Sequence, residues 1–133
     1  MLLIVDSRRV NSGVRRLSLF KEVYNLKCHM LGVKIEITRF IDDSFPGFVE
    51  CRLIDAWGNQ HLFIEKVPIV TSESLDGSNS YPQSGIIACR IVDRRDVDGH
   101  EILKIETETP WHIESTTGET SFNVGRNQLV EFD

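Results

Sequence analysis

The 133-residue sequence has few cysteines and no long apolar run. Its cysteines, Cys28, Cys51 and Cys89, are odd in number and lack a C-x-x-C spacing, which argues against a disulfide framework. No apolar run is long enough to cross a bilayer, and the N-terminus lacks the apolar core of a secretory signal. We therefore expect a soluble, cytoplasmic protein whose thiols stay reduced and which does not enter a membrane.

The motifs of nucleotide binding and nucleophilic catalysis are also missing. The sequence contains neither a G-x-G-x-x-G nor a G-x-x-x-x-G-K loop, and it has no G-x-S-x-G nucleophile elbow. Asp42 and Asp43 are adjacent, so on an extended chain their carboxylates point to opposite faces and do not converge. An enzyme would need a site that only folding assembles, and we favour a protein without catalytic activity.

Metal-binding patterns are equally weak. The segment Asp96-Val97-Asp98-Gly99 invites comparison with an EF-hand loop, but with Gly99 at position 6 the chain has Ile105 at position 12, where calcium needs a glutamate. The histidines also lack the close spacing of a local metal clamp. They are His29, His61, His100 and His112. We predict no metal and no cofactor.

The net charge of −5 is unevenly distributed along the chain. Residues 1–29 hold six basic and two acidic side chains, whereas residues 30–133 hold nine basic and eighteen acidic ones. We interpret 1–29 as a basic extension upstream of a translation start at Met30; a targeting segment and an arm that recruits an acidic partner are the alternatives. Residues 30–133 then form one domain, whose acidity disfavours nucleic acid and suits a basic protein partner.

Alternation of apolar and polar residues predicts strands from Val33 onward. Val33, Ile35 and Ile37 alternate with charged or polar residues, as a half-buried strand requires. Similar patterns predict strands at 48–54, 60–67, 86–95, 101–107, 111–114 and 120–124, and a closing strand at 129–132. We expect an all-β domain, a small antiparallel barrel or sandwich built from hairpins, with about seven strands.

A repeated turn connects the predicted hairpins. The segments 55–58, 96–99 and 115–118 share the form Asp/Ser-x-x-Gly, in which a side-chain oxygen binds the turn's backbone and glycine supplies the left-handed residue of a G1 bulge. Phe45-Pro46-Gly47 predicts a type II turn with proline in its second position. We expect the 17-residue connection 68–84 to be a crossover with one helical turn at 72–75.

Aromatic residues in the predicted loops are the candidate binding residues. Trp57 lies inside the first hairpin turn, Tyr81 lies in the long connection, and Trp111 begins the third hairpin. Exposed Trp and Tyr side chains often anchor protein contacts, although such rings can instead plug the ends of a barrel. Two histidines lie close to these rings in sequence and complete the candidate set. The predicted binding residues are Trp57, His61, Tyr81, Trp111 and His112.

The stretch ITRFIDDSFPGFVECRLIDAWGNQHLFIEKVPIV and the later TPWHIES resemble small bacterial proteins of uncharacterised function. The resemblance implies one compact bacterial domain and brings no activity or ligand with it. From the loop aromatics and the acidic body, we predict a non-catalytic protein-binding module, either an adaptor or an immunity-type protein.

Two alternatives remain open. The first is a nucleic-acid-binding or ribosome-associated β-barrel, in which the basic arm and several arginines contact phosphates. These arginines are Arg39, Arg52, Arg90, Arg94 and Arg95. The second is a small hydrolase or isomerase with a site at the barrel mouth around Asp55, His61 and His100; a strongly perturbed histidine would favour it.

Overall fold

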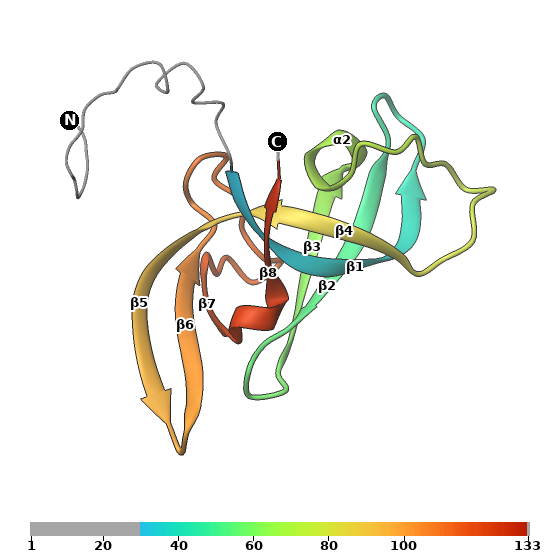
Figure 1. Ribbon diagram of the computed structural model, residues 1–133. Helices are drawn as coiled ribbons and strands as arrows, with labels where there is room; N and C mark the ends of the chain where they lie inside the picture. The colour runs from blue at the N-terminus through green and yellow to red at the C-terminus, as the bar shows by residue number, and fades with distance from the viewer. Residues whose placement is uncertain (1–29, 133) are drawn as a thin grey trace. The chain divides into compact units, whose positions relative to one another are not determined.

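A computed structural model describes residues 30–132 (Figure 1). The interpretation of residues 1–29 as a basic extension lies outside the described residues. The strands are β1 (Met30–Asp42), β2 (Phe48–Ile54), β3 (Gln60–Lys66), β4 (Gln83–Ala88), β5 (Arg90–Val97), β6 (His100–Glu106), β7 (Ser121–Val124) and β8 (Leu129–Phe132). The helical segments are α2 (Val67–Val70) and the 3-10 turn η1 (Arg126–Gln128).

The strands form two antiparallel sheets, which confirms the all-β prediction. Five strands make the first sheet, in the order β3-β2-β1-β4 with β8 also paired to β1, and β5-β6-β7 make the second. Within residues 30–132 the strands do not close into a barrel. The described residues thus form eight strands, and the choice between barrel and sandwich stays a prediction. Among these residues no helix is long and apolar enough to span a membrane.

The long strand β1 organises the first sheet. Val33, Ile35 and Ile37 are all buried, as their alternation predicted. β1 pairs with β4 through residues 32–37 and with β2 through residues 36–42 (Figure 1). Its length allows it to pair with two different strands along successive parts. Register shifts after Ile37 and Phe40 interrupt its ladder with β2.

The predicted strand 86–95 is divided in two. β4 ends at Ala88 and β5 begins at Arg90, and the two halves belong to different sheets. Between them, the buried Cys89 donates its backbone N–H to the carbonyl of Leu31 at 3.0 Å. The apolar alternation continues through Cys89, so the sequence pattern gave no indication that the pairing partner changes there.

Two of the three repeated turns form as predicted. The N–H groups of Gly58 and Gly118 donate to the carbonyls of Asp55 and Ser115 at 3.0 and 2.9 Å, and both glycines have positive φ. The third turn differs, because Val97 pairs with His100 across a two-residue loop in which Asp98 and Gly99 both have positive φ. That geometry is typical of a type I′ turn, so the predicted G1 bulge at 96–99 is wrong.

Two predictions around the prolines are also wrong. The N–H of Gly47 donates to the carbonyl of Ser44 at 2.6 Å, so Pro46 occupies the third turn position instead of the second. The helical turn lies at α2 and not at 72–75. Pro68 sits in the first turn of α2, where its fixed φ and missing N–H are tolerated, and β3 accordingly ends at Lys66.

The segment 111–114, which was predicted as a strand, is a loop folded against the end of β6. The N–H of Ile113 donates to the carbonyl of Thr107 at 2.9 Å, and the Thr107 hydroxyl donates to the carbonyl of Ile113 at 2.5 Å. His112 has a φ of 52°, outside the strand region. Hydrogen bonds between the buried residues Thr107 and Ile113 therefore take the place of sheet pairing in this segment.

Gly85 on β4 offers a direct test of the packing in the first sheet. A Cβ atom at this position would lie 3.0 Å from side-chain carbons of both Ile35 and Ile37. We expect Gly85→Ala to lower the free energy of unfolding by about 1–3 kcal/mol, because these buried side chains must move. Urea unfolding measures the change, with the exposed neighbour substitution Ser84→Ala as control. Equal stability of the two variants would contradict the tight packing.

Candidate functional site

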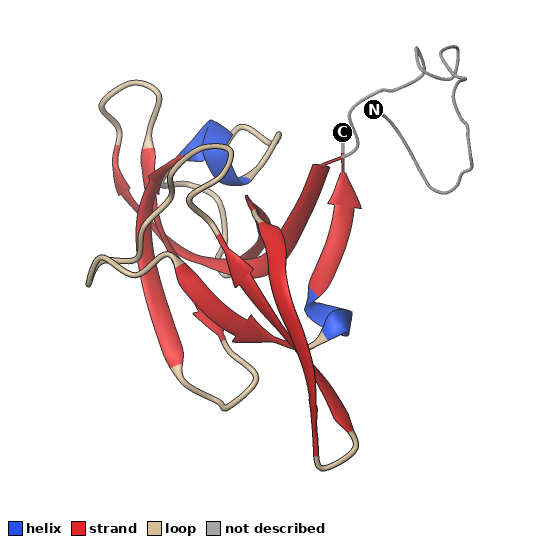
Figure 2. Ribbon diagram, turned by 90° about the vertical axis from the view of Figure 1, so that its left-hand side faces the viewer, coloured by secondary structure: helices blue, strands red, loops and turns tan. Residues whose placement is uncertain are grey.

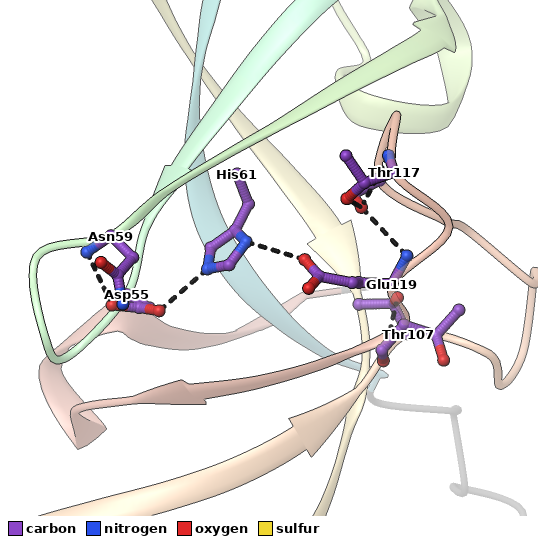
Figure 3. Close-up of polar contacts among 8 residues, drawn as sticks. Asp55, Asn59, His61, Thr107, Thr117 and Glu119 are labelled. Atoms are coloured by element: carbon purple, nitrogen blue, oxygen red, sulfur yellow. Dashed lines mark hydrogen bonds and ion pairs between the residues drawn. The ribbon is translucent and has the colours of Figure 1, made fainter.

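Three side chains from separate segments meet at the junction of the two sheets (Figure 3). Nε2 of His61 lies 2.8 Å from Oδ2 of Asp55, and Nδ1 of His61 lies 3.1 Å from Oε1 of Glu119. Asp55 follows β2, His61 is on β3, and Glu119 follows the turn 115–118. We call Asp55, His61 and Glu119 the histidine clamp, because they fasten this turn to the β2–β3 hairpin.

Asp55 is the most heavily bonded member of the clamp. Its Oδ1 accepts hydrogen bonds from the backbone N–H groups of Trp57 and Asn59, both at 2.9 Å, and its side chain is only 7% exposed. Burial acts to raise the pKa of Asp55, but the hydrogen bonds from His61, Asn59 and Trp57 outweigh it and hold the pKa below its usual range. Asp55 is therefore a carboxylate that fixes the conformation of the Trp57 turn.

Backbone contacts reinforce the clamp on both sides. The N–H of Thr116 donates to the carbonyl of Leu62, and the N–H of Ala56 donates to the carbonyl of Asn123, both at 2.8 Å. The rings of His61 and Phe122 pack against each other in a T-shaped arrangement, with centroids 4.9 Å apart and an angle of 67° between their planes. The β2–β3 hairpin is thus anchored to β7 and to the turn before it.

The chemistry of the clamp favours positioning over catalysis. A neutral imidazole can donate only one hydrogen bond, whereas an imidazolium can donate to both carboxylates. Both ring nitrogens of His61 already face carboxylates, and in the described residues no hydroxyl or thiol hydrogen-bonds to them. Burial raises the pKa of Cys51 and of Cys89 to about 12, so neither thiol has the character of a nucleophile.

Metal binding gains no support either. Within residues 30–132 no group of three His, Cys, Asp or Glu side chains is arranged to hold an ion. His100, which the enzyme interpretation placed with Asp55 and His61, starts β6. It has no hydrogen bond to the clamp in the described residues, but it lines the same cavity as Asp55. Hydrogen bonds therefore join two of those three residues, and the cavity brings the third beside Asp55.

A groove lies beside the clamp. It encloses about 550 Å³, a volume within the usual range for binding sites. Three segments form its walls: the turn after β2, the tip of the β5–β6 hairpin, and η1 with the glycine before it. The lining residues are Asp55, Ala56, Trp57, Val97, Asp98, His100, Glu101, Ile102, Gly125, Arg126, Asn127 and Gln128. We call this cavity the Trp57 groove, because the Trp57 side chain is 50% exposed there.

The Trp57 groove carries more negative than positive charge. Three carboxylates line it, and Arg126 is its one guanidinium. Glu101 accepts from Nε of Arg126 at 2.8 Å and from Arg94, and these hydrogen bonds lower its pKa to about 2. Glu101 therefore stays ionised at any ordinary pH, and Asp98 at the hairpin tip adds an exposed carboxylate.

The five predicted binding residues occupy three places. Trp57 and His61 are neighbours through Asp55, which contacts both. Trp111 is 44% exposed in the loop after β6, next to His112, whose Nε2 lies 2.9 Å from Glu114. Tyr81 is separate and partly buried against the core, and its hydroxyl donates to the carbonyl of Asp76 at 2.7 Å. No contact among these residues therefore links Trp57, Trp111 and Tyr81 to one another in the described part of the chain.

Sequence reasoning missed Glu119 and Arg126, which complete the clamp and the groove. Glu119 lies 58 residues from His61, and Arg126 lies 25 residues from Glu101. No local pattern links such pairs. Asp55 was detectable, because it opens an Asp-x-x-Gly turn and precedes a histidine that enters the next strand.

Comparisons with known proteins do not extend this picture: no family model, curated protein or solved structure matches the chain.

Proposed function

We propose that this protein is a non-catalytic protein-binding module that recognises its partner through the Trp57 groove. The observation that carries the proposal is the half-exposed Trp57 ring on the wall of a 550 Å³ groove. A tryptophan that already lies in a concave site can bury a large apolar area at low entropic cost, and such residues dominate protein interfaces.

The charge of the groove suggests the kind of partner. Residues 30–133 hold twice as many acidic as basic side chains, and carboxylates outnumber the guanidinium in the groove itself. Such a surface attracts a basic partner and accelerates its association at low salt. An adaptor or an immunity-type protein with a basic target fits this arrangement, and the two buried, unpaired thiols Cys51 and Cys89 suit a reducing cytoplasm.

The histidine clamp supports a rigid binding surface. Asp55 holds the backbone N–H of Trp57 and is itself held by His61, so the groove wall is fixed before a partner arrives. A site that is ordered in advance loses less entropy on binding. The same bonds leave no free ring nitrogen on His61 for acid–base catalysis, which weakens the hydrolase or isomerase alternative.

The nucleic-acid alternative has less support from the contacts. Four of the five candidate arginines form ion pairs within the chain: Arg39 with Glu50, Arg52 with Glu36, Arg90 with Glu106, and Arg94 with Glu101. Each carboxylate neutralises a side chain that phosphate contact would need. A phosphate backbone must therefore compete with acidic neighbours at these four positions.

Substitution of Trp57 tests the proposal. Immobilised wild type and Trp57→Ala are each used to capture partners from lysate, and the captured protein is identified by mass spectrometry. The affinity of each variant for that partner is then measured with purified proteins. We expect Trp57→Ala to weaken binding by about 30-fold or more, as at an interface hot spot, with an unchanged melting temperature.

Trp111→Ala is the matched control, because Trp111 is similarly exposed but does not line the groove. It should leave the affinity within about threefold of wild type. Equal losses in both variants, or RNA as the sole captured component, would contradict recognition of a protein by the Trp57 groove.

A further inference from the structure

Strand β5 is an exposed sheet edge. Seven of its eight residues, Arg90 to Asp96, are exposed, and β5 is the outer strand of the sheet β5-β6-β7. Within residues 30–132 no strand pairs with its free edge, and the β5–β6 hairpin extends beyond β7 (Figure 2). Ile91 and Val92 add exposed apolar side chains to this edge. A free edge of this kind is a template for another strand.

The hairpin geometry determines which backbone groups are free. Val97 and His100 flank a two-residue loop and form a hydrogen-bonded pair, so Arg95 and Asp93 also bond to β6. The backbone groups of Arg94 and Asp96 then point away from β6. Consistent with this, the N–H of Arg94 donates to its neighbour's carboxylate, Oδ1 of Asp93, at 2.8 Å.

We propose that β5 pairs with β5 of a second copy of this chain, antiparallel and with the two-fold axis at Arg94. In this register Arg94 of each copy exchanges backbone hydrogen bonds with Arg94 of the other, and its N–H gives up the bond to Oδ1 of Asp93. Asp93 lies opposite Arg95 twice, so two ion pairs flank the axis. Farther out, Val92 lies opposite Asp96, beside the bulge that interrupts β5 between Ile91 and Asp93.

The sequence of β5 is thus complementary to itself in this register. Charged edge strands ordinarily resist pairing with other chains, but here the opposite charges of Asp93 and Arg95 favour a copy of the same strand. The unfavourable pairs are Arg94 opposite Arg94 and Val92 opposite Asp96, and each Arg94 guanidinium is already held by Glu101 of its own chain. The bulge at Val92 lies toward the ends of the new ladder, so its three central pairs involve regular strand.

Charge reversal across the interface tests this register. Sedimentation of the full chain, from about 10 µM to about 1 mM, should show an average mass that rises toward that of a dimer. Asp93→Arg places arginines opposite each other, and Arg95→Asp places aspartates opposite each other. We expect each single variant to associate at least about tenfold more weakly than wild type.

The decisive sample is a mixture of the two single variants. Asp93→Arg in one chain and Arg95→Asp in the other restore opposite charges at both positions, so the mixture should associate as tightly as wild type within about threefold. Lys34→Glu, at an exposed position on β1 in the other sheet, is the control for net charge and should leave association unchanged. A wild type that stays monomeric at 1 mM, or a mixture as weak as its components, would overturn the proposal.

Discussion

Replacing Phe63 with alanine is expected to lower the free energy of unfolding by about 3–5 kcal/mol, the cost of removing a buried phenyl ring. Phe63 on β3 is 0% exposed, and its ring packs edge-on against Phe122 on β7 with centroids 5.6 Å apart. The contact links the two sheets, so the cavity would lie at their junction. A single domain has about 5–15 kcal/mol of stability, so this loss is a large fraction of the total.

Phe45→Ala is the matched control for this experiment. The Phe45 ring is 96% exposed at the β1–β2 turn, so its removal should change stability by no more than about 0.5 kcal/mol. Urea unfolding followed by circular dichroism gives both values, provided that the denaturant slope is the same in each variant. If the two substitutions lower the free energy of unfolding equally, the packing of Phe63 does not stabilise the contact between the sheets.

The hairpins were predictable because their determinants are local. The strand β2 and the turn at Asp55 depend on alternation and on a glycine within a few residues, and both formed where the sequence indicated. The core positions Val49, Cys51 and Leu53 on β2 are all buried, as the period of two required. Local propensity and packing agree in this part of the chain.

Long-range pairing decided the elements that the sequence did not predict. The N–H of Cys89 bonds to Leu31, 58 positions earlier in the sequence, which extends the pairing of β4 with β1. From Arg90 onward the chain pairs with β6 instead, and no window of alternation contains both partners. The segment 111–114 has an apolar residue at Ile113, but Thr107 supplies its hydrogen bonds and keeps it out of a sheet. A strand needs a partner, and the identity of that partner is not encoded locally.

The candidate site shows the same difference between local and long-range determinants. The exposed position of Trp57 followed from its place inside a tight turn. The bond between Asp55 and His61 joins neighbouring parts of one hairpin, whereas the bond from His61 to Glu119 crosses between segments that only folding brings together. The sequence thus indicated the loop that carries the ring but not the clamp that holds the loop.

Asp55→Ala is expected to be the second most damaging substitution, at a cost of about 2–4 kcal/mol. It removes the acceptor of three hydrogen bonds, from the N–H groups of Trp57 and Asn59 and from the His61 ring. The half-buried imidazole and the turn would both lose their partner. Since the same turn carries Trp57, we also expect weaker binding at the Trp57 groove, in addition to the lower stability in urea.

The free energies of unfolding of wild type and Asp55→Asn, compared over a range of pH, separate the contribution of the Asp55 charge from that of its shape. Because the pKa of Asp55 lies below its usual 3.8 in the folded chain, its charge stabilises the fold fully above that pH and progressively less as the pH falls through the folded value. The stability difference between wild type and Asp55→Asn should therefore be largest near neutral pH and shrink in acid. Asp98→Asn, at an exposed carboxylate of the same groove, is the control for the loss of one negative charge. A difference that is constant with pH would mean that the clamp holds the Trp57 turn by shape alone.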